Sequence, residues 1–321
     1  MADELWAITA YFNPMHWRRR RENYRRFRQA LRIPLVAVEL GYDGRFDLEP
    51  GDADILLQFS ATDVMWQKER LLNLALQAVP EGVEKVACLD GDVILGRPDI
   101  WPEVSRALDE TPLVQLFSHV FYLPADHPID FELIEQTRTP ALGFAWLRQQ
   151  GQSISDLCNP VWKNPNEDPP VTYGLAWAFR CELFASRGFY DAWVVGGGTR
   201  VHCFAGDGQW QEAAAAMRFH PNTREHFRRW AQAFHAEVRG VFGCVSGSIA
   251  HLWHGTLAGR KYRQRYEDFA RFAFDPDADL TFDEHGAWRW NSDKPAMHNY
   301  VRQYFAGRQE DCAEEAPVVA A

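Results

Sequence analysis

Two carboxylates stand two residues apart in the segment Val83–Ile100, which reads VEKVACLDGDVILGRPDI. Asp90 and Asp92 follow the apolar run Val86–Leu89, so the pattern predicts a buried strand that delivers both side chains to its C-terminal end. Carboxylates at such an edge repel each other and resist burial unless a cation joins them. Their oxygen atoms suit a hard divalent ion such as Mg2+ or Mn2+. The alternative is an ordinary Asp-Gly turn between two strands.

The elements around this segment predict an α/β fold. Strands alternate with helices over the first hundred residues, which is typical of a mostly parallel sheet with helices on both faces. In such sheets, ligands bind beyond the carboxyl ends of the strands, where Asp90 and Asp92 are expected. The predicted strands are Leu5–Phe12, Leu35–Leu40, Asp54–Phe59, Val114–Tyr122, Val171–Phe179 and Val241–Trp253. The first predicted helix carries Trp17, Tyr24, Phe27 and Leu31 on one face, and the others are Met65–Leu76, Trp101–Leu108, Ala141–Gln150, Gly208–Met217 and Arg224–Val238.

One region interrupts this alternation. Between Pro124 and Pro170 the residues Pro, Asn, Asp, Gln and Gly become frequent, which is typical of an insertion whose loops recognise a substrate. We therefore expect one domain over residues 1–274, with residues 124–170 shaping the acceptor site. Residues 275–321 form a C-terminal extension, and we expect disorder from Gln309 onward. The residues expected on the acceptor side are Trp146, Trp162, Tyr173, Gly174 and Trp177.

Composition narrows the class of protein. The chain has 321 residues, of which 46% are hydrophobic, enough for a full core. A net charge of −10 argues against a general nucleic-acid binder, although arginines gather between Arg18 and Arg28. The six cysteines form no C-x-x-C pair, and neither a signal peptide nor a membrane span is evident. We therefore expect a cytoplasmic protein with reduced thiols.

Several short motifs occur in a telling order. The segment WQKERLLNLALQA precedes ACLDGDVIL by about a dozen residues. Downstream lie the segment Tyr173–Arg180, then Phe184 and Gly188–Asp191, and finally Ser-Ile-Ala-His ending at His251. Together these motifs resemble metal-dependent glycosyltransferases of the GT-A fold, a Rossmann-like nucleotide-diphospho-sugar transferase fold. They are most similar to the β-1,4-galactosyltransferase and polypeptide N-acetylgalactosaminyltransferase group, and the resemblance covers roughly residues 5–265.

The resemblance implies a role for individual residues. Asp92 would bind the metal directly, and Asp90 would contact the ribose or bind the metal through water. His251 would be the third ligand, with His254 as its rival. The residues implied in binding the nucleotide sugar are Lys68, Arg70 and Asn73 on the nucleotide side, Thr9, Tyr11 and Glu39 at the base and ribose, and Arg260 and Lys261 at the diphosphate. For Arg70, Arg260 and Lys261, a plain solvated surface is the alternative.

One departure from the family pattern concerns the catalytic base. Inverting members carry an acidic residue just after a Gly-Gly step, whereas this chain continues from Gly196-Gly197-Gly198 into Thr199 and Arg200. An inverting transfer needs a carboxylate within hydrogen-bond reach of the acceptor hydroxyl. The nearest carboxylates in the sequence, Asp191 and Asp207, are the candidates for that role in an inverting transfer. A retaining transfer needs no acid in that place, so the stereochemical outcome stays open.

The sequence thus predicts transfer of a sugar from a nucleotide-diphosphate sugar, UDP-linked by resemblance, to an acceptor hydroxyl group with Mn2+ or Mg2+. The acceptor is left open between a carbohydrate such as a polysaccharide, a protein, a small molecule and a hydroxymethylated DNA base, the last disfavoured by net charge. Two alternatives remain. One is a sugar-1-phosphate nucleotidyltransferase, and the other is a non-catalytic carbohydrate-binding protein on a decayed transferase fold.

Overall fold

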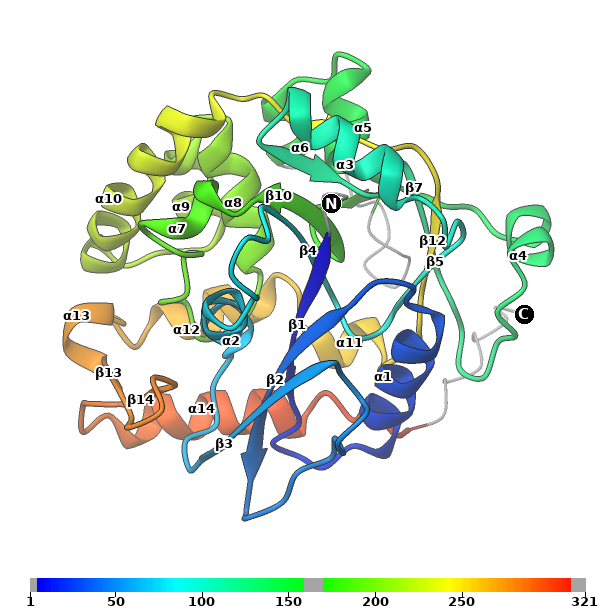
Figure 1. The fold of residues 1–321 in the computed structure, drawn as a ribbon. Helices are drawn as coiled ribbons and strands as arrows, with labels where there is room; N and C mark the ends of the chain where they lie inside the picture. Colours follow the sequence, from blue (N-terminus) through cyan, green and yellow to red (C-terminus); the bar gives the residue numbers. More distant parts are fainter. Residues whose placement is uncertain (1–4, 159–169, 313–321) are drawn as a thin grey trace, which may run out of the picture.

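A seven-stranded sheet forms the centre of the protein (Figure 1). The computed structural model describes residues 5–158 and 170–312. The strands lie in the order β11-β6-β10-β4-β1-β2-β3. Their bounds are β1 Trp6–Phe12, β2 Leu35–Tyr42, β3 Ile55–Ala61, β4 Lys85–Leu89, β6 Leu113–Gln115, β10 Ala176–Arg180 and β11 Gly243–Cys244. Parallel pairing joins β4, β1, β2 and β3, and β11 to β6, whereas β10 runs antiparallel to both of its neighbours. The predicted mostly parallel α/β sheet is confirmed.

Alternating side chains give this sheet two buried faces. Along β1, Ala7 and Tyr11 pack into one core cluster, and Ile8 and Phe12 pack into the other. The first face is covered by α1 and α3, and the second by α2, α5, α8 and α10. The bounds of these helices are α1 Arg18–Ala30, α2 Lys68–Gln77, α3 Trp101–Glu110, α5 Phe144–Gln149, α8 Gly198–Gly206 and α10 Pro221–Val238. Helices therefore cover both faces, as predicted.

A second sheet of five strands lies beside the first, in the order β5-β12-β7-β8-β9. Its strands are β5 Val93–Leu95, β7 His119–Tyr122, β8 Ala141–Gly143, β9 Val171–Thr172 and β12 Ser248–His251. Three segments that were each predicted as one strand are divided between the two sheets. These segments gave β6 and β7, β9 and β10, and β11 and β12. An apolar run looks the same in either sheet because both are buried, so the pattern did not reveal the crossing.

The region between residues 124 and 170 is more regular than predicted. It contains α4 (Phe131–Thr137), strand β8, helix α5 and α6 (Ile154–Cys158). The predicted helix Ala141–Gln150 is wrong at its start, because residues 141–143 pair with β7 and β9 as a strand. Residues 159–169, which include Trp162, lie outside the described part of the chain.

Shorter elements complete the fold and lead into the C-terminal region. They are α7 Glu182–Ala185, α9 Trp210–Ala216, α11 Leu257–Arg260, α12 Gln264–Ala270, α13 Pro276–Asp279, β13 Leu280–Phe282, β14 Trp288–Trp290 and α14 Pro295–Ala306. In Figure 1, α14 runs along the bottom of the molecule beneath the central sheet. None of the helices in the described ranges is both long and apolar enough to cross a membrane.

The residues that directly follow α14, up to Cys312, are ordered, so disorder does not begin at Gln309, and residues 313–321 lie outside the described part of the chain. The carboxylate of Glu310 is fully buried, and it accepts from Arg20 at 2.5 Å and from Arg308 at 2.7 Å. The neighbouring carboxylate of Asp311 accepts from the backbone N–H groups of Arg18 and Arg19, at the first turn of α1. An anion is favourable there because helix N-termini leave N–H groups unpaired.

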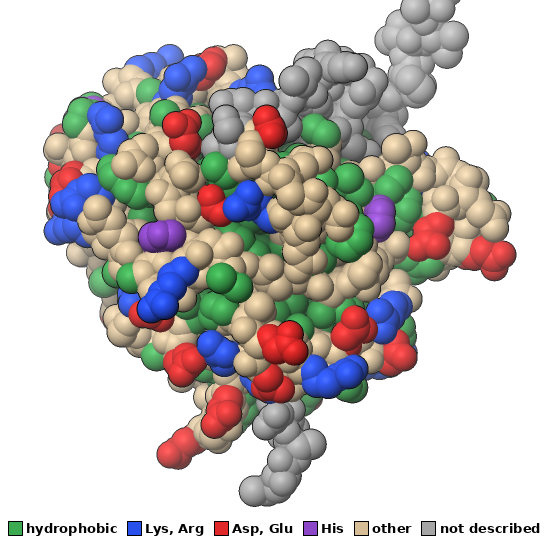
Figure 2. All heavy atoms as spheres, turned by 90° about the horizontal axis from the view of Figure 1, so that it is seen from above, with side chains coloured by type: hydrophobic (Ala, Val, Ile, Leu, Met, Phe, Trp, Pro, Cys, Tyr) green, Lys and Arg blue, Asp and Glu red, His purple; other side chains and the backbone are tan. Residues whose placement is uncertain are grey.

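The arginines of α1 are largely paired with carboxylates. Besides Arg20, ion pairs join Arg18 to Glu22 at 2.7 Å and Arg28 to Asp54 at 3.1 Å. On the face shown in Figure 2, Lys and Arg side chains are interspersed with Asp and Glu and do not gather into a basic patch. Since phosphate backbones are bound by surplus positive charge, the arginine run of α1 gives little support to nucleic-acid binding.

We expect Glu310→Gln to lower the free energy of unfolding by about 3–5 kcal/mol, because the substitution leaves the buried Arg308 and the partly buried Arg20 without a countercharge. Burial raises the pKa of Glu310, but Arg20 and Arg308 outweigh it, and the net shift is downward. The stabilisation is thus present above the ordinary glutamate pKa and is lost as the pH falls through the folded-state pKa. Urea unfolding at pH 7 and at lower pH measures both effects.

The matched control is Glu103→Gln, which removes an exposed ion pair with Arg97. That change is expected to cost less than about 1 kcal/mol. If the two variants were equally stable at pH 7, the buried pairing of Glu310 would not contribute as described.

Candidate functional site

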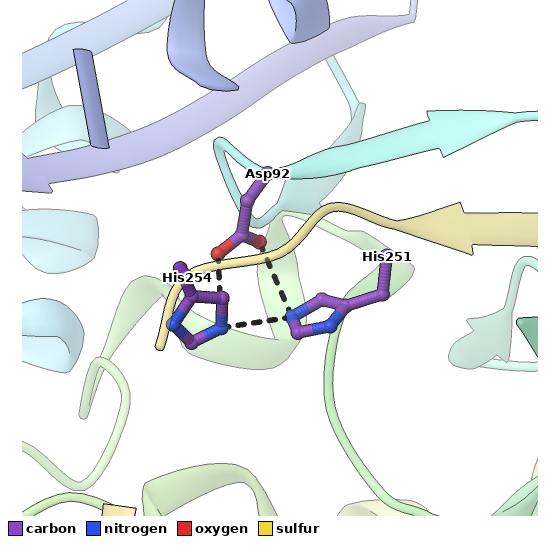
Figure 3. Close-up of side chains that lie close together, drawn as sticks. All are labelled: Asp92, His251 and His254. Carbon is purple, nitrogen blue, oxygen red and sulfur yellow. Dashed lines mark hydrogen bonds and ion pairs between the residues drawn. The ribbon is translucent and has the colours of Figure 1, made fainter. Parts of the chain in front are cut away.

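Three side chains converge beside the edge of the central sheet (Figure 3). Asp92 lies in the turn between β4 and β5, and its backbone carbonyl accepts from Leu252 N–H at 2.8 Å. Strand β5 pairs antiparallel with β12, and this register sets Val93 opposite His251. His254 follows three residues later, beyond the end of β12. The pairing of β5 with β12 therefore brings the carboxylate of Asp92 close to the imidazoles of His251 and His254, which lie far away in the sequence.

The two imidazole rings form a directed chain of hydrogen bonds. Nδ1 of His254 lies 3.2 Å from a guanidinium nitrogen of Arg308, which can only donate, so Nδ1 accepts. In the neutral ring the hydrogen is then on Nε2, which lies 3.1 Å from Nε2 of His251. His251 thus keeps a lone pair on Nε2, which is the form that binds a metal. This assignment of hydrogens is inferred from the network of donors and acceptors.

These residues fit a divalent cation. Asp92 Oδ1 is buried without a hydrogen-bond partner in the described structure, and an anionic oxygen in that position favours a cation. The carboxylate oxygens of Asp92 lie 3.7 Å from Nε2 of His251 and 3.4 Å from Nε2 of His254. Neighbouring ligands of an octahedral ion with bonds of about 2.1 Å stand roughly 3 Å apart, so small movements complete such a shell.

Burial keeps the imidazole rings neutral. It is the largest cause that lowers the pKa of His251, to about 3, and Arg260 lowers it further. The pKa of His254 is also lowered well below its usual value, for the same two reasons. Burial raises the pKa of Asp92, while Arg20 and Arg260 lower it. A bound cation would favour the ionised carboxylate.

Asp90 does not join this cluster. Its carboxylate forms an ion pair with Nζ of Lys68, and its backbone N–H donates to Leu175 O at 2.8 Å. The side chains that cluster as direct metal ligands in the described structure are those of Asp92, His251 and His254, without Asp90. The expected roles of Asp90, a ribose contact or a metal contact through water, stay predictions. Asp92 points to the histidines, whereas Asp90 and Lys68 form a neighbouring pair on the same wall.

The cluster opens into a cavity of about 300 Å³. Cationic side chains outnumber carboxylates along its wall. The cations are Arg20, Lys68, Arg200, Arg260, Arg263, Arg265 and Arg308, and the carboxylates are Glu69, Asp90 and Asp92. Among the described residues, the buried guanidinium of Arg265 contacts the hydroxyls of Tyr266 and Tyr304 at 2.6 Å and pairs with no carboxylate. Buried cations without countercharge favour an anionic ligand.

Two residues predicted on the nucleotide side, Arg70 and Asn73, instead hold the fold together. Asn73 bonds the backbone N–H and C=O of Phe189 and donates to Asp191 at 2.8 Å. Arg70 pairs with the same carboxylate at 3.2 Å and donates to Gly286 O. Asp191, predicted as a catalytic candidate, is thus occupied in this clamp and does not line the cavity. The two motifs quoted from the sequence contact each other, which explains their spacing structurally.

The residues predicted to border the base and ribose also use their polar atoms internally. Thr9 donates to Leu89 O at 2.7 Å, and the Tyr11 hydroxyl donates to Asp47 at 2.8 Å. The Glu39 carboxylate accepts from the N–H groups of Asp47 and Leu48 and from Gln58. All three predicted residues are buried outside the cavity wall. The loop after β2 folds back and takes up hydrogen bonds of Tyr11 and Glu39, whereas Thr9 bonds to the end of β4.

The remaining predicted residues divide between the cavity and the rest of the fold. Tyr173, Gly174 and Arg260 line the cavity. Asp207 pairs with Arg148 at 2.8 Å at the end of α8, so it is not at the site. Lys261 is exposed outside the cavity wall, Trp146 lies beside His119, and Trp177 is buried with its indole N–H on Tyr173 O.

Sequence reasoning missed several residues of the cavity wall. Arg20, Glu69, Arg265 and Arg308 line it, and Glu310 lies behind two of them. Glu69 stands inside the quoted WQKERLLN segment, so its place in a helix before the acidic strand was a usable signal. For Arg308 and Glu310 the sequence carried no signal, because only the fold returns the C-terminal end to the first helix.

The sequence matches no protein-family model, and a search of curated proteins found no match. Similar solved structures include a protein from Desulfovibrio desulfuricans described as a nucleotide-diphospho-sugar transferase, with 13% identity, TM-score 0.33, and 95% of this chain and 99% of that chain covered. Another, from Bacillus anthracis, is described as a glucose-1-phosphate thymidylyltransferase (12%, TM-score 0.35, 88% and 98% covered). A third is 4-diphosphocytidyl-2C-methyl-D-erythritol synthase from Anaerococcus prevotii (11%, TM-score 0.32, 76% and 88% covered). At these TM-scores the likeness assigns neither a family nor an activity.

Proposed function

We propose that this protein transfers a sugar from a nucleotide-diphosphate sugar to an acceptor hydroxyl group, with Mn2+ or Mg2+ bound by Asp92 and His251. The observation that carries the proposal is the shared cavity. A carboxylate and imidazole cluster that fits a divalent cation opens into a space of about 300 Å³ walled by arginines. The phosphates of a nucleoside diphosphate match the arginines in charge, and its bound cation matches the carboxylate and imidazole cluster.

Within this proposal the residues of the chain bind and orient the donor. Arg260 and Arg308 present buried guanidinium groups to the diphosphate oxygens, where hydrogen bonds between charged groups are strongest. Lys68 supplies a further cation beside Asp90. The cation, when bound, neutralises charge that develops on the departing diphosphate.

The finer assignment rests on the motifs. Their order resembles the β-1,4-galactosyltransferase and polypeptide N-acetylgalactosaminyltransferase group, which supports a hexosyl group and a UDP-linked donor. A carbohydrate hydroxyl is the acceptor we favour. A hydroxymethylated DNA base is less well supported, because carboxylates pair with most of the arginines of α1.

Two other functions make different predictions. A sugar-1-phosphate nucleotidyltransferase needs a glycine-rich basic loop after the first strand, but here the chain after β1 reads Asn-Pro-Met-His. A non-catalytic carbohydrate-binding protein would have no reason to keep the cluster of Asp92, His251 and His254. Release of a nucleoside diphosphate from a nucleotide sugar separates all three functions, since a nucleotidyltransferase releases a different product and a binding protein releases none.

We expect Asp92→Asn to reduce metal-dependent release of nucleoside diphosphate at least 100-fold, because the substitution removes the anionic metal ligand. The unfolding free energy should stay equal or rise, since burial of the carboxylate is costly in the metal-free protein. The assay measures hydrolysis of UDP-, GDP-, ADP- and dTDP-sugars with Mn2+. The control is Asp99→Asn, an exposed aspartate beyond β5. Wild-type rates in Asp92→Asn with Mn2+ still required would contradict the metal assignment.

We also expect His251→Ala to weaken Mn2+ binding at least tenfold and more than His254→Ala does. The reason is the hydrogen-bond chain, in which Arg308 leaves the Nε2 hydrogen on His254 and the Nε2 lone pair on His251. Calorimetric titration of Mn2+ into the wild type and both variants measures the order. The reverse order would transfer the ligand role to His254.

A further inference from the structure

One carboxylate of the cavity is used by neither the metal cluster nor an ion pair. Of the acidic side chains on the described cavity wall, Asp92 faces the histidines and Asp90 pairs with Lys68. The third is Glu69, on the first turn of α2, and its side chain is buried. Among the described residues it forms no ion pair. Its Oε2 accepts from the indole N–H of Trp66 at 2.9 Å, which fixes the direction of the carboxylate.

The glycines at the start of α8 make room for this carboxylate. A Cβ atom on Gly198 would clash with Oε1 of Glu69, so no other residue fits at 198 without moving it. The ring of His202 helps to position Gly198, because its Nδ1 bonds Gly198 O at 2.7 Å. Its Nε2 accepts from Tyr190 N–H at 3.0 Å. Both ring nitrogens of His202 are thereby occupied, so His202 is not itself a free base.

We propose that Glu69 is the general base that accepts the proton of the attacking hydroxyl group. This inference rests on the sugar transfer proposed above. The Glu69 carboxylate lines the cavity beside Gly197 and Gly198. Directly after these glycines, inverting members of the resembling family carry an acidic residue, whereas this chain has Thr199. A side chain from α2 thus supplies, in space, the group that the chain does not carry at residue 199.

The acceptor O–H bond breaks and its proton passes to a Glu69 oxygen while the acceptor oxygen bonds to the anomeric carbon. The bond from that carbon to the diphosphate oxygen breaks, and its electron pair leaves with the diphosphate. This direct displacement requires the base and the leaving diphosphate on opposite sides of the sugar, and it inverts the configuration at the anomeric carbon.

The surroundings of Glu69 suit this role at neutral pH. Burial raises the pKa of Glu69 to about 7, with Lys68 lowering it and Asp90 raising it. From α12, Tyr266 approaches the same glycines, and a Cβ on Gly197 would clash with its hydroxyl oxygen. A base whose pKa is close to the working pH combines a useful ionised fraction with a strong tendency to accept a proton.

The test first compares wild type and Glu69→Gln in hydrolysis of the same panel of nucleotide sugars with Mn2+. We expect kcat to fall about 10²–10⁴-fold, with the affinity for UDP and Mn2+ unchanged within twofold by calorimetry. Wild-type activity should rise with pH through about 7, because the base must be ionised, and Glu69→Gln should lose that rise. Glu182→Gln, at an exposed glutamate on α7, is the control.

Chemical rescue distinguishes a base from a structural residue. Azide attacks without losing a proton, so Glu69→Ala with azide should form a glycosyl azide of inverted configuration, detected by mass spectrometry and NMR. If Glu69→Gln kept kcat within threefold of wild type, or lost UDP affinity in proportion to kcat, the role of Glu69 would be overturned. If wild type hydrolysed no nucleotide sugar, the proposed transfer itself would fail, and the base with it.

Trp66→Phe keeps the test decisive if Glu69 variants do not fold. Removing the indole N–H takes a hydrogen bond from the ionised carboxylate and should raise the pKa of Glu69. The rise of activity with pH should then occur at a higher pH than in the wild type. An unchanged pH dependence would show that the titrating group is not Glu69.

Discussion

The buried ion pairing of Glu310 is the interaction on which the histidine pair depends. One carboxylate holds both Arg20 and Arg308, and Arg308 in turn donates to Nδ1 of His254. Without that carboxylate, two guanidinium groups would stand beside the imidazoles and repel any cation placed there. The C-terminal residues therefore belong to the electrostatics of the site, although they follow the last helix.

The charges around the cavity are sorted rather than mixed. Asp92 and the imidazoles form one region, and most of the charged side chains on the rest of the wall are arginines. Charges in a partly desolvated cavity interact more strongly than charges in water, so this separation selects strongly among ligands. An anion alone would leave the carboxylate of Asp92 unmatched, and a cation alone would meet the arginines. A ligand that brings both charges satisfies the whole wall.

Sequence reasoning recovered what depends on local pattern. Alternating apolar segments gave the parallel strands and their covering helices. The Asp-Gly-Asp segment and the late histidines gave all three members of the cluster, with His254 named as the rival of His251. It failed where one polar group could meet several partners. Tyr11 and Glu39 bond to the loop that follows β2, and Asp191 bonds to Arg70 and Asn73. A motif predicts that such residues lie near one another in the fold. Only the packing decides whether they contact a ligand or each other.

At the glycines before α8, packing instead brings in a side chain from a distant part of the sequence. Their φ values at Gly196 and Gly197 are positive, and the space a side chain would need at Gly198 is filled by Glu69. The motif lacks an acid when it is read along the chain, yet a carboxylate lies beside it in the fold. What a reaction requires is an oxygen atom at a given point, and any element whose side chain reaches that point can provide it. In the proposed transfer that side chain is Glu69 on α2, whose carboxylate is held by the indole N–H of Trp66 and fills the space beside Gly198.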